Sequence, residues 1–542
     1  MWKTSSVRLH NDMSPEATET IPYEIPPIVP EATQSLSTQT SQVAARFEDG
    51  FATAMRDNLS AARSSLSGYL NSLLPTPTVA PLIVVNGRSP FEWMWPPESS
   101  LHTGRLSALA AQPVIFARKL IQLALCLEHQ DIGSSDIPNL CPGEPLSHTA
   151  QRFLSIAEHV TSQDLLVDSV DGLEALMLEA LYQVHLGNAE DASLIFRRGL
   201  SIAESMGLLN AAAVSDERTK SAVFRFIYAD RFTSLYRGSP YALDDSSFLR
   251  TYVLEADTPA SKLERTQIVI AGHIITRNIR MQHKRIQGQV YEKDTLIIDR
   301  MLKQSIRSLP TVWWAPPSAA GLMQEEATEA TGRLITQMHQ FYLVLLSQQP
   351  YFLQELHKST ANPDDRASKS EVLNGSLISI LSASREIING FLIERTFRHV
   401  PASFKGVEHK AFIAAVSLLL AHIDGHRQGD ANSLEYQRPH DLQLIKTVIA
   451  DIEHMNLSNV GGSDSGVATT LRELSSIEAD AADSARYVVW SDWCARTQGL
   501  DTSLHPGGSS SLTITIPYFG MIHMLPQISI SSRTVSDDGH LV

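Results

Sequence analysis

The chain has 542 residues, of which 43% are hydrophobic, and its formal net charge is −15 at pH 7. This apolar content is ample for a large core. The negative charge argues against broad phosphate binding, because nucleic-acid affinity depends mainly on clustered Lys and Arg. Few cysteines and the lack of a signal peptide indicate a reducing intracellular compartment.

The first hundred residues divide into three predicted segments. Residues 1–45 are rich in Ser, Thr, Pro and Glu, a composition that predicts disorder. Residues 46–75 carry apolar side chains at helical spacing and predict one amphipathic helix, which either dimerises or docks on the rest of the chain. Residues 76–100 contain turn-forming prolines and a Trp-Met-Trp cluster, and they predict an extended linker.

Residues 101–460 are predicted to form one large helical body, so the expected fold class is all-α. Apolar side chains recur there three and four residues apart. Outside 173–248, the helices expected from this spacing cover 113–129, 149–160, 263–286, 294–309, 324–346, 372–392, 408–423 and 441–455. Prolines, Pro350 among them, are expected in the loops between these helices.

The segment Leu173–Phe248 predicts three consecutive amphipathic helices followed by a turn at Gly238-Ser239-Pro240. Gly187 and Gly207 lie where the first two helices should end, since glycine tolerates the left-handed conformation of a helix C-terminus. Ser215 is the expected N-cap of the third helix.

The third of these helices carries a charged pair towards its apolar face. Its periodicity buries Phe226 and also turns Asp230 to the core, where a charge needs a partner. Adjacent helical residues do not face each other, so we expect Asp230 and Arg231 to pair with different helices. We interpret both as structural, because no nucleophile, metal cluster or glycine-rich loop accompanies them.

These patterns resemble the middle homology region of fungal-specific zinc-cluster transcription factors. The signature segment is Phe224–Arg231, followed by Gly238-Ser239-Pro240 and Leu243-Asp244-Asp245. Two later segments, Ile298–Trp314 and Met338–Phe352, resemble further helices of that region in the right order. Together the matching segments span about residues 100–355.

The resemblance implies a transcription regulator that acts in the nucleus and, as family members often do, controls a biosynthetic gene cluster. Its partners would be the transcription machinery or another transcription factor, with homodimer formation left open. The signature core, in a structural or regulatory role, consists of Phe226, Asp230, Arg231, Gly238, Pro240, Asp244 and Asp245.

The chain departs from the family at its DNA-binding module. The family's module holds two zinc ions with six cysteines, whereas this chain has three, Cys126, Cys141 and Cys494, none in a paired ligand spacing. Two interpretations follow. Either the regulator works without the module and acts through partners, or an N-terminal exon that encodes the module is missing from this sequence.

Residues 461–542 are expected to form a partly ordered acidic tail. Glu478, Asp480 and Asp483 precede Tyr487, Trp490 and Trp493, and acidic residues interleaved with aromatic ones resemble an activation segment that folds on contact with a coactivator. The alternative is a C-terminal helix that packs on the body. The final run 512–530 alternates weakly and predicts a β-hairpin or an extended cover.

Neither the basic stretch nor the scattered histidines of the chain indicates a catalytic or metal-binding site. Arg277, Arg280, Lys284 and Arg285 form either a weak nuclear signal, a phosphate contact or, more simply, a solvated helix face. Single histidines such as His339 and His422 are interpreted as surface or satisfied core residues. Phe412–Ala421 is the best candidate for a membrane span, but it has about half the length that a bilayer requires, so we interpret it as a buried helix.

Motifs for nucleotide, metal and hydrolase chemistry are missing from the sequence. The acidic pairs Asp244-Asp245 and Asp364-Asp365 lack the third acid of a magnesium motif, so we interpret them as turn and capping residues. The chain is therefore predicted not to be an enzyme and to need no cofactor or metal. Our leading hypothesis is a transcription regulator. The alternative is a helical scaffold or corepressor that binds another protein without contacting DNA.

Overall fold

A computed structural model describes most of the chain after residue 112. The described ranges are 113–128, 146–209, 216–244, 258–283, 289–317, 324–361, 371–397, 405–429, 432–458, 466–494 and 512–526. All of them belong to one compact unit, Asn71–Val542. The predicted disorder of 1–45, the helix at 46–75 and the linker at 76–100 lie outside the described residues.

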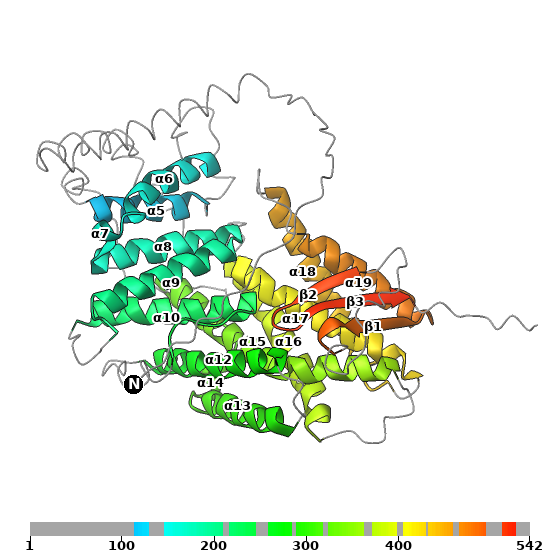
Figure 1. Cartoon of the computed structure of the whole chain (residues 1–542). Helices are drawn as coiled ribbons and strands as arrows, with labels where there is room; N and C mark the ends of the chain where they lie inside the picture. Colours follow the sequence, from blue (N-terminus) through cyan, green and yellow to red (C-terminus); the bar gives the residue numbers. More distant parts are fainter. Residues whose placement is uncertain are drawn as a thin grey trace, which may run out of the picture. The chain divides into compact units, whose positions relative to one another are not determined.

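The all-α fold class is confirmed, because the described residues are helical apart from one small sheet (Figure 1). The helices are α5 (Pro113–Glu128), α6 (Leu146–Thr161), α7 (Asp164–Val167), α8 (Val170–Leu186), α9 (Ala189–Ser205), α10 (Glu217–Arg237), α12 (Pro259–His283), α13 (Gln289–Arg307), α14 (Thr311–Trp314), α15 (Gln324–Ala361), α16 (Glu371–Phe397), α17 (Lys405–His426), α18 (Arg438–Ser458) and α19 (Val467–Ala482). The strands are β1 (Tyr487–Ser491), β2 (Leu512–Ile516) and β3 (Gly520–Pro526).

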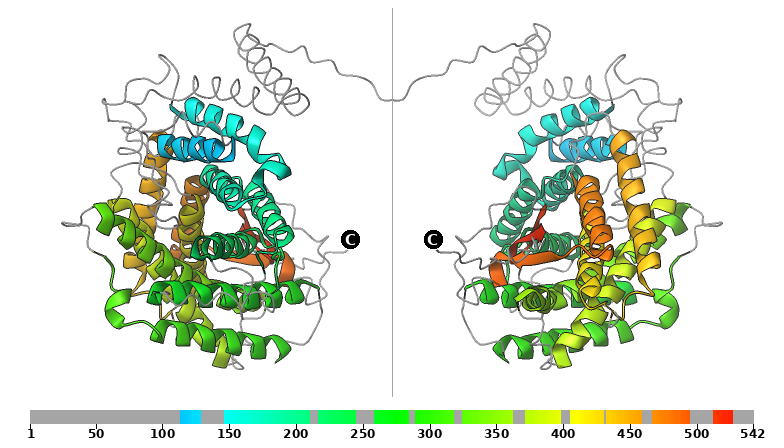
Figure 2. Two further views of the ribbon diagram at one scale, coloured as in Figure 1. Left: turned by 90° about the vertical axis from the view of Figure 1, so that its left-hand side faces the viewer. Right: turned by 90° about the vertical axis from the view of Figure 1, so that its right-hand side faces the viewer.

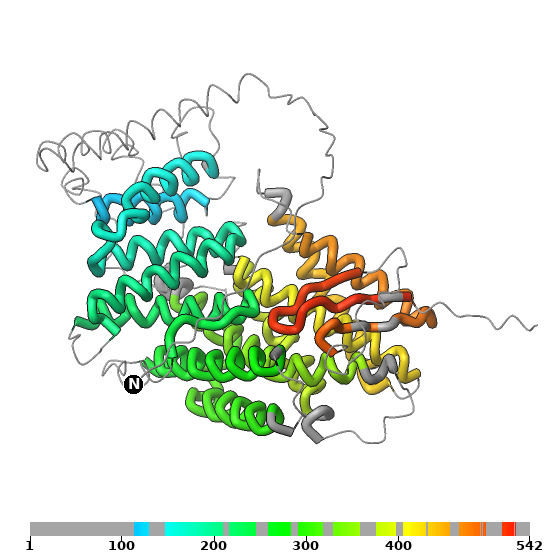
Figure 3. The backbone as a smooth tube through the Cα atoms, in the orientation of Figure 1, coloured from blue at the N-terminus to red at the C-terminus, as the bar shows by residue number. Residues whose placement is uncertain are grey.

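The predicted helices α8, α9 and α10 pack in succession, as the backbone trace in Figure 3 shows. Gly187 and Gly207 have φ of 87° and 72°, the left-handed conformation expected of them. The N-cap of α10 is Asp216 and not Ser215, which lies outside the described residues. The Asp216 carboxylate accepts hydrogen bonds from the backbone N–H groups of Arg218 and Thr219, at 3.3 and 3.1 Å, and so caps the helix.

The long helix α15 lies at the centre of the packing, in contact with α12, α13, α16 and α17. α10 joins the N-terminal helices to this centre, because it contacts α8 and α9 on one side and α12 on another. The central core is built from buried aliphatic side chains of these helices, among them Ile274, Leu345, Ile387 and Leu419. Buried area of this kind supplies most of the stability of a helical body.

The described residues after 461 pack on the same hydrophobic core as the helices before them. α19 lies against α17, and β1, β3 and β2 form an antiparallel sheet in that order. The side views in Figure 2 show the strands, in red, lying among the helices. Within Glu478–Trp493, the helix α19 continues only to Ala482 and the strand β1 follows, with Glu478 and Trp493 both buried; an activation role for this segment stays a prediction. The predicted β-hairpin is present as β2 and β3.

The turn of this hairpin lies against the signature turn after α10. The Tyr518 hydroxyl donates hydrogen bonds to the backbone carbonyls of Ser234 and Ser239, at 2.8 and 3.1 Å. Gly238 has a φ of 69°, and a Cβ at that position would lie 2.6 Å from the Tyr518 nitrogen. Both its conformation and the close approach therefore require glycine.

The expected end of a helix at Pro350 is wrong, because α15 continues through this proline to Ala361. Proline has no N–H to donate to the carbonyl four residues earlier, which here belongs to Leu346. The buried guanidinium of Arg277 takes over this role, donating to the carbonyls of Leu346 at 3.3 Å and Ser347 at 2.7 Å. A side chain from α12 thus satisfies the backbone that the proline leaves unpaired.

This role also corrects the interpretation of the basic stretch. Arg277 is 1% exposed, and its guanidinium also donates to Asn278 and Thr295. Burial lowers the pKa of Arg277 to about 10, so it stays charged at neutral pH. Arg277 is neither part of a solvated face nor available to a nuclear import receptor. Lys284 and Arg285 lie outside the described residues.

Two described helical windows, Gly375–Thr396 and Lys405–His426, are long and apolar enough to cross a membrane by length and composition alone. The second includes Phe412–Ala421, and the interpretation of this stretch as a buried helix is confirmed. Within the fold, 83% of the Lys405–His426 window and 50% of the Gly375–Thr396 window are buried. The core position of α17 accounts for its apolar composition.

We predict that Arg277→Met lowers the free energy of unfolding by about 2–4 kcal/mol, because it leaves buried carbonyls unpaired. Pro350→Ala restores an N–H that can pair with Leu346, so the double variant should lose less than the sum of the two single variants. Urea unfolding of all four proteins measures this coupling. Strictly additive losses would show that Arg277 does not serve the carbonyls at the proline.

Candidate functional site

The signature helix α10 carries two buried charges, each with partners outside the helix. The Asp230 carboxylate accepts hydrogen bonds from Arg197 of α9 at 3.3 Å and from the backbone N–H of Ala242 at 2.7 Å. Burial raises the pKa of Asp230, although these two donors act in the opposite direction. Arg231 donates to the carbonyls of Ile268 in α12, at 2.8 Å, and of Leu243, at 3.0 Å. The prediction that the pair reaches different helices is confirmed.

Phe226 fills the space between α10 and α9. It is fully buried, and its ring meets that of Phe196 edge to face, with centroids 6.3 Å apart. Gly199 of α9 makes this packing possible, because a Cβ there would lie 2.2 Å from the Phe226 ring. The two helices therefore approach closely at a glycine.

The remaining residues of the predicted core lie in the turn after α10. The Pro240 carbonyl accepts hydrogen bonds from the Ser234 hydroxyl, at 3.1 Å, and from Arg197. Asp244 is exposed, and Asp245 lies outside the described residues. The structure thus places Phe226, Asp230 and Arg231 in the buried middle of α10 and Gly238 and Pro240 at its C-terminal end. A regulatory role for this set stays a prediction.

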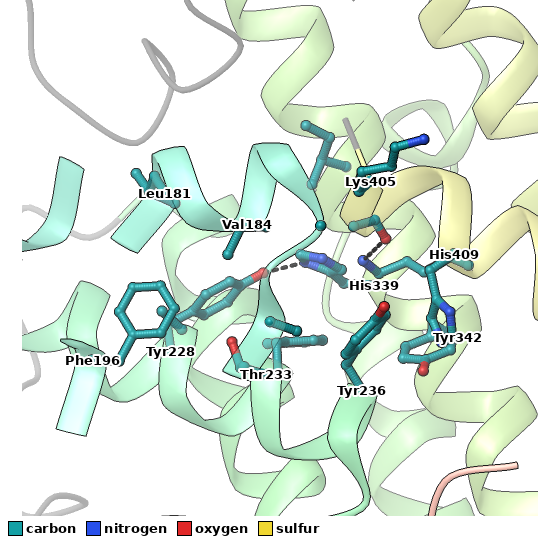
Figure 4. Close-up of a pocket in the computed structure, with 17 residues that line it drawn as sticks. Leu181, Val184, Phe196, Tyr228, Thr233, Tyr236, His339, Tyr342, Lys405 and His409 are labelled. Carbon is teal, nitrogen blue, oxygen red and sulfur yellow. Dashed lines mark hydrogen bonds between the residues drawn. The ribbon is translucent and has the colours of Figure 1, made fainter. Parts of the chain in front are cut away.

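The opposite side of α10 faces a cavity of about 110 Å³ that the sequence did not reveal (Figure 4). Its walls come from α8, α9, α10, α15 and α17 and are mainly apolar and aromatic. The lining residues are Leu181, Val184, Gly187, Ala189, Phe196, Tyr228, Ala229, Phe232, Thr233, Tyr236, Ile335, His339, Tyr342, Lys405, Gly406, His409 and Lys410.

Aromatic and imidazole rings from three helices contact one another in this cavity and fix the positions of its polar groups. The Tyr228 hydroxyl forms a hydrogen bond with Nδ1 of His339, and Phe232 stacks on the same imidazole with centroids 4.2 Å apart. Tyr236 meets the His409 ring edge to face, also at 4.2 Å. The Lys410 amine donates to the Gly406 carbonyl at 2.8 Å. His339 and Lys410 are thus held by hydrogen bonds, and His409 by its ring contact with Tyr236.

Burial keeps the basic groups of the cavity from carrying their ordinary charge. It lowers the pKa of His339 well below the usual range, the pKa of His409 to about 3 and that of Lys410 to about 7. Both imidazoles are therefore neutral at pH 7. An apolar cavity with a few polar groups is the usual form of a small-molecule site.

The sequence offered only a partial signal for this cavity. Tyr228, Phe232 and Tyr236 recur every four residues and so share one side of α10. The interpretation of His339 as a satisfied core residue is consistent with its hydrogen bond to Tyr228, whereas His422 pairs with Asp441 through Nε2 only and its buried Nδ1 has no partner among the described residues. Among the described residues, no group of three or more His, Cys, Asp or Glu side chains is placed to hold a metal ion.

Gly199→Ala should lower the free energy of unfolding by about 1–3 kcal/mol, because its methyl group would overlap the Phe226 ring. Gly375→Ala is the matched control in α16, where a Cβ meets nothing within 4 Å. The control should be stabilised by up to about 1 kcal/mol, since alanine favours helix. Thermal and urea unfolding measure both. A stabilised Gly199→Ala protein would show that α9 and α10 do not meet as described.

The low pKa of His409 predicts a pH dependence of stability. The unfolded chain takes up a proton on this residue below its ordinary pKa of 6.5, whereas the folded chain does so only near 3. Stability should therefore fall as pH decreases through this window. His409→Leu should reduce the slope by up to about 1.4 kcal/mol per pH unit near pH 5.

Urea unfolding at a series of pH values between 7 and 4 tests this prediction. His440→Leu in α18 is the matched control, because His440 is exposed and meets similar solvent in the folded and unfolded chain. An unchanged slope in His409→Leu would contradict the buried, neutral state of this imidazole.

Comparison with known proteins finds sequence similarity to fungal regulators. The chain is 30% identical over 447 residues to the "Dehydrocurvularin biosynthesis regulator" of Aspergillus terreus and 29% identical over 426 residues to that of Alternaria cinerariae. It is 24% identical over 440 residues to "Transcription factor sdnS" of Sordaria araneosa. No family model matches the chain, and no solved structure matches it.

These similarities cover 76–79% of this chain but only 52–58% of the three relatives. The chain therefore spans about half the length of the curated relatives it matches. Over roughly three quarters of its own length, it is a homologue of fungal transcription factors and biosynthesis regulators.

Proposed function

We propose that this chain is a transcription regulator of a biosynthetic gene cluster and that its helical body corresponds to the middle homology region of zinc-cluster factors. The observation that carries the proposal is the similarity over 76–79% of the chain to two proteins named as dehydrocurvularin biosynthesis regulators. We infer that it acts in the nucleus, as transcription regulators do.

The packing around α10 supports a regulatory body that works as one unit. Asp230 ties α10 to α9, Arg231 ties it to α12, and Tyr518 brings the C-terminal hairpin to its end. A change at any of these contacts would be transmitted to helices far apart in the sequence. The signature core, in this proposal, holds the surface by which the body meets the transcription machinery or another transcription factor.

Contact with DNA is the part of the proposal that the described body supports least. Many of its guanidinium groups are engaged by carboxylates and are therefore not free for phosphates. Such pairs include Arg118–Glu174, Arg218–Asp171, Arg225–Glu264, Arg385–Asp441, Arg395–Asp451 and Arg438–Glu478. We propose that DNA is reached through a partner or through a segment of a longer native chain.

A helical scaffold or corepressor is the second candidate. The engaged arginines and the three cysteines of the chain favour it, because neither supplies a DNA-reading surface. Reading the genomic sequence upstream of Met1 separates the two candidates. An in-frame Cys-x-x-Cys exon supports a DNA-binding regulator, whereas its absence supports the scaffold.

Chromatin immunoprecipitation of the tagged native protein, followed by binding of purified protein to the enriched fragments, tests the proposed function. We expect enrichment at promoters of one biosynthetic cluster. Enrichment with direct binding supports a DNA-reading regulator, and enrichment without it supports a recruited coregulator. If no promoter is enriched, the transcription role is wrong and only the scaffold stays open.

A reporter-gene assay and urea unfolding test the signature core. Asp230→Ala removes the acceptor of the Ala242 N–H and one acceptor of Arg197, so we expect stability to fall by about 1–3 kcal/mol and transcriptional output to be lost. Asp164→Ala is the matched control, since Asp164 forms an exposed ion pair with Arg198 and should change stability by less than about 1 kcal/mol. Unchanged folding and output in Asp230→Ala would remove the importance assigned to this core.

A further inference from the structure

We propose that the cavity between α10, α15 and α17 binds a small neutral molecule, or the end of a larger one, made of an apolar ring that carries a single hydroxyl or carbonyl oxygen. This inference is independent of the role in transcription. It follows from the size, the lining and the polar groups of the cavity.

The cavity has the size of one ring. Its volume is about 110 Å³, and an engineered apolar cavity of about 150 Å³ in another protein binds benzene. Its walls suit a flat ring, because Phe196, Tyr228, Phe232 and Tyr236 present aromatic surfaces. A longer ligand would extend past Lys405 and Gly187, where the wall is formed by helix ends.

The polar groups of the cavity can pair with one oxygen atom of a ligand. Figure 4 shows Tyr236 of α10 beside His409 of the facing helix α17, and both residues line the cavity. Nε2 of His409 is buried and has no hydrogen-bond partner within the described part of the chain. A buried polar atom is normally paired, so an oxygen that donates to or accepts from this nitrogen would complete the site.

The charge of the cavity selects a neutral ligand. A cation would face the amines of Lys405 and Lys410. A carboxylate would have to give up its hydration in an apolar cavity, and the one buried amine there already donates to the Gly406 carbonyl. Burial lowers the pKa of Lys410 to about 7, which indicates that this environment disfavours charge of either sign.

Three fluorinated probes distinguish these alternatives on the purified full chain. 4-Fluorophenol carries a ring and a hydroxyl, fluorobenzene only the ring, and 4-fluorobenzoate a ring with a negative charge. Titration followed by ¹⁹F line broadening gives their dissociation constants. We expect 4-fluorophenol to bind about two- to tenfold more tightly than fluorobenzene, the difference that one neutral hydrogen bond provides. 4-Fluorobenzoate should bind most weakly.

Substitutions assign the binding to this cavity. Ala229→Leu fills it and should weaken both neutral probes at least tenfold, whereas Ser201→Leu, an exposed position on α9, is the matched control and should leave them unchanged. His409→Leu and Tyr236→Phe remove polar atoms. Each should reduce the preference for 4-fluorophenol over fluorobenzene while fluorobenzene still binds.

Three outcomes would overturn the proposal. The first is that neither neutral probe binds, which would indicate that water and not a ligand pairs with Nε2 of His409. The second is binding that Ala229→Leu does not weaken, which would place the probes elsewhere. The third is tightest binding of 4-fluorobenzoate, which would make Lys410 the recognition group. Should Ala229→Leu fail to fold, the preference measured in Tyr236→Phe decides, since it removes one hydroxyl group and no carbon.

Discussion

The structure depends on how α10 buries two adjacent opposite charges without pairing them to each other. Asp230 and Arg231 point to different neighbours, and each is satisfied by one helix and by the turn that follows α10. An unsatisfied charge in such a place is costly, so α9, α12 and the turn must all be present for either residue to be tolerated.

The same physical principle operates a second time, at the centre of the body. Arg277 lies on α12. The Ile268 carbonyl of the same helix accepts a hydrogen bond from Arg231. The Arg277 guanidinium donates hydrogen bonds to the carbonyls of Leu346 and Ser347, and this allows α15 to continue through Pro350 as one long helix. In both places a planar cation with several donors pairs with backbone carbonyls. α12 is thereby linked by hydrogen bonds to α10 on one side and to α15 on the other.

The sequence predicted the features that local spacing controls. The helices, the glycine ends of α8 and α9, and the need of Asp230 for a partner on another helix all follow from periodicity and capping. The continuation of α15 through Pro350 could not be predicted, because Arg277 lies 70 residues from the carbonyl of Ser347 that it serves. The cavity was missed for a similar reason. Tyr228 and His339, which are 111 residues apart, give no sign in the sequence that they share a site.

The contact between Tyr518 and the end of α10 bears on how the protein is made. The Tyr518 hydroxyl and the Ser234 carbonyl that it serves are 284 residues apart in the chain. At a ribosomal rate of about 5–20 residues per second, roughly 15–60 s pass between the synthesis of the two. During this interval the signature turn lacks its cover, so the nascent helical body exposes a surface that the finished protein hides. A truncated transcript that ends before residue 512 would leave that surface exposed permanently, as a target for chaperones and proteases.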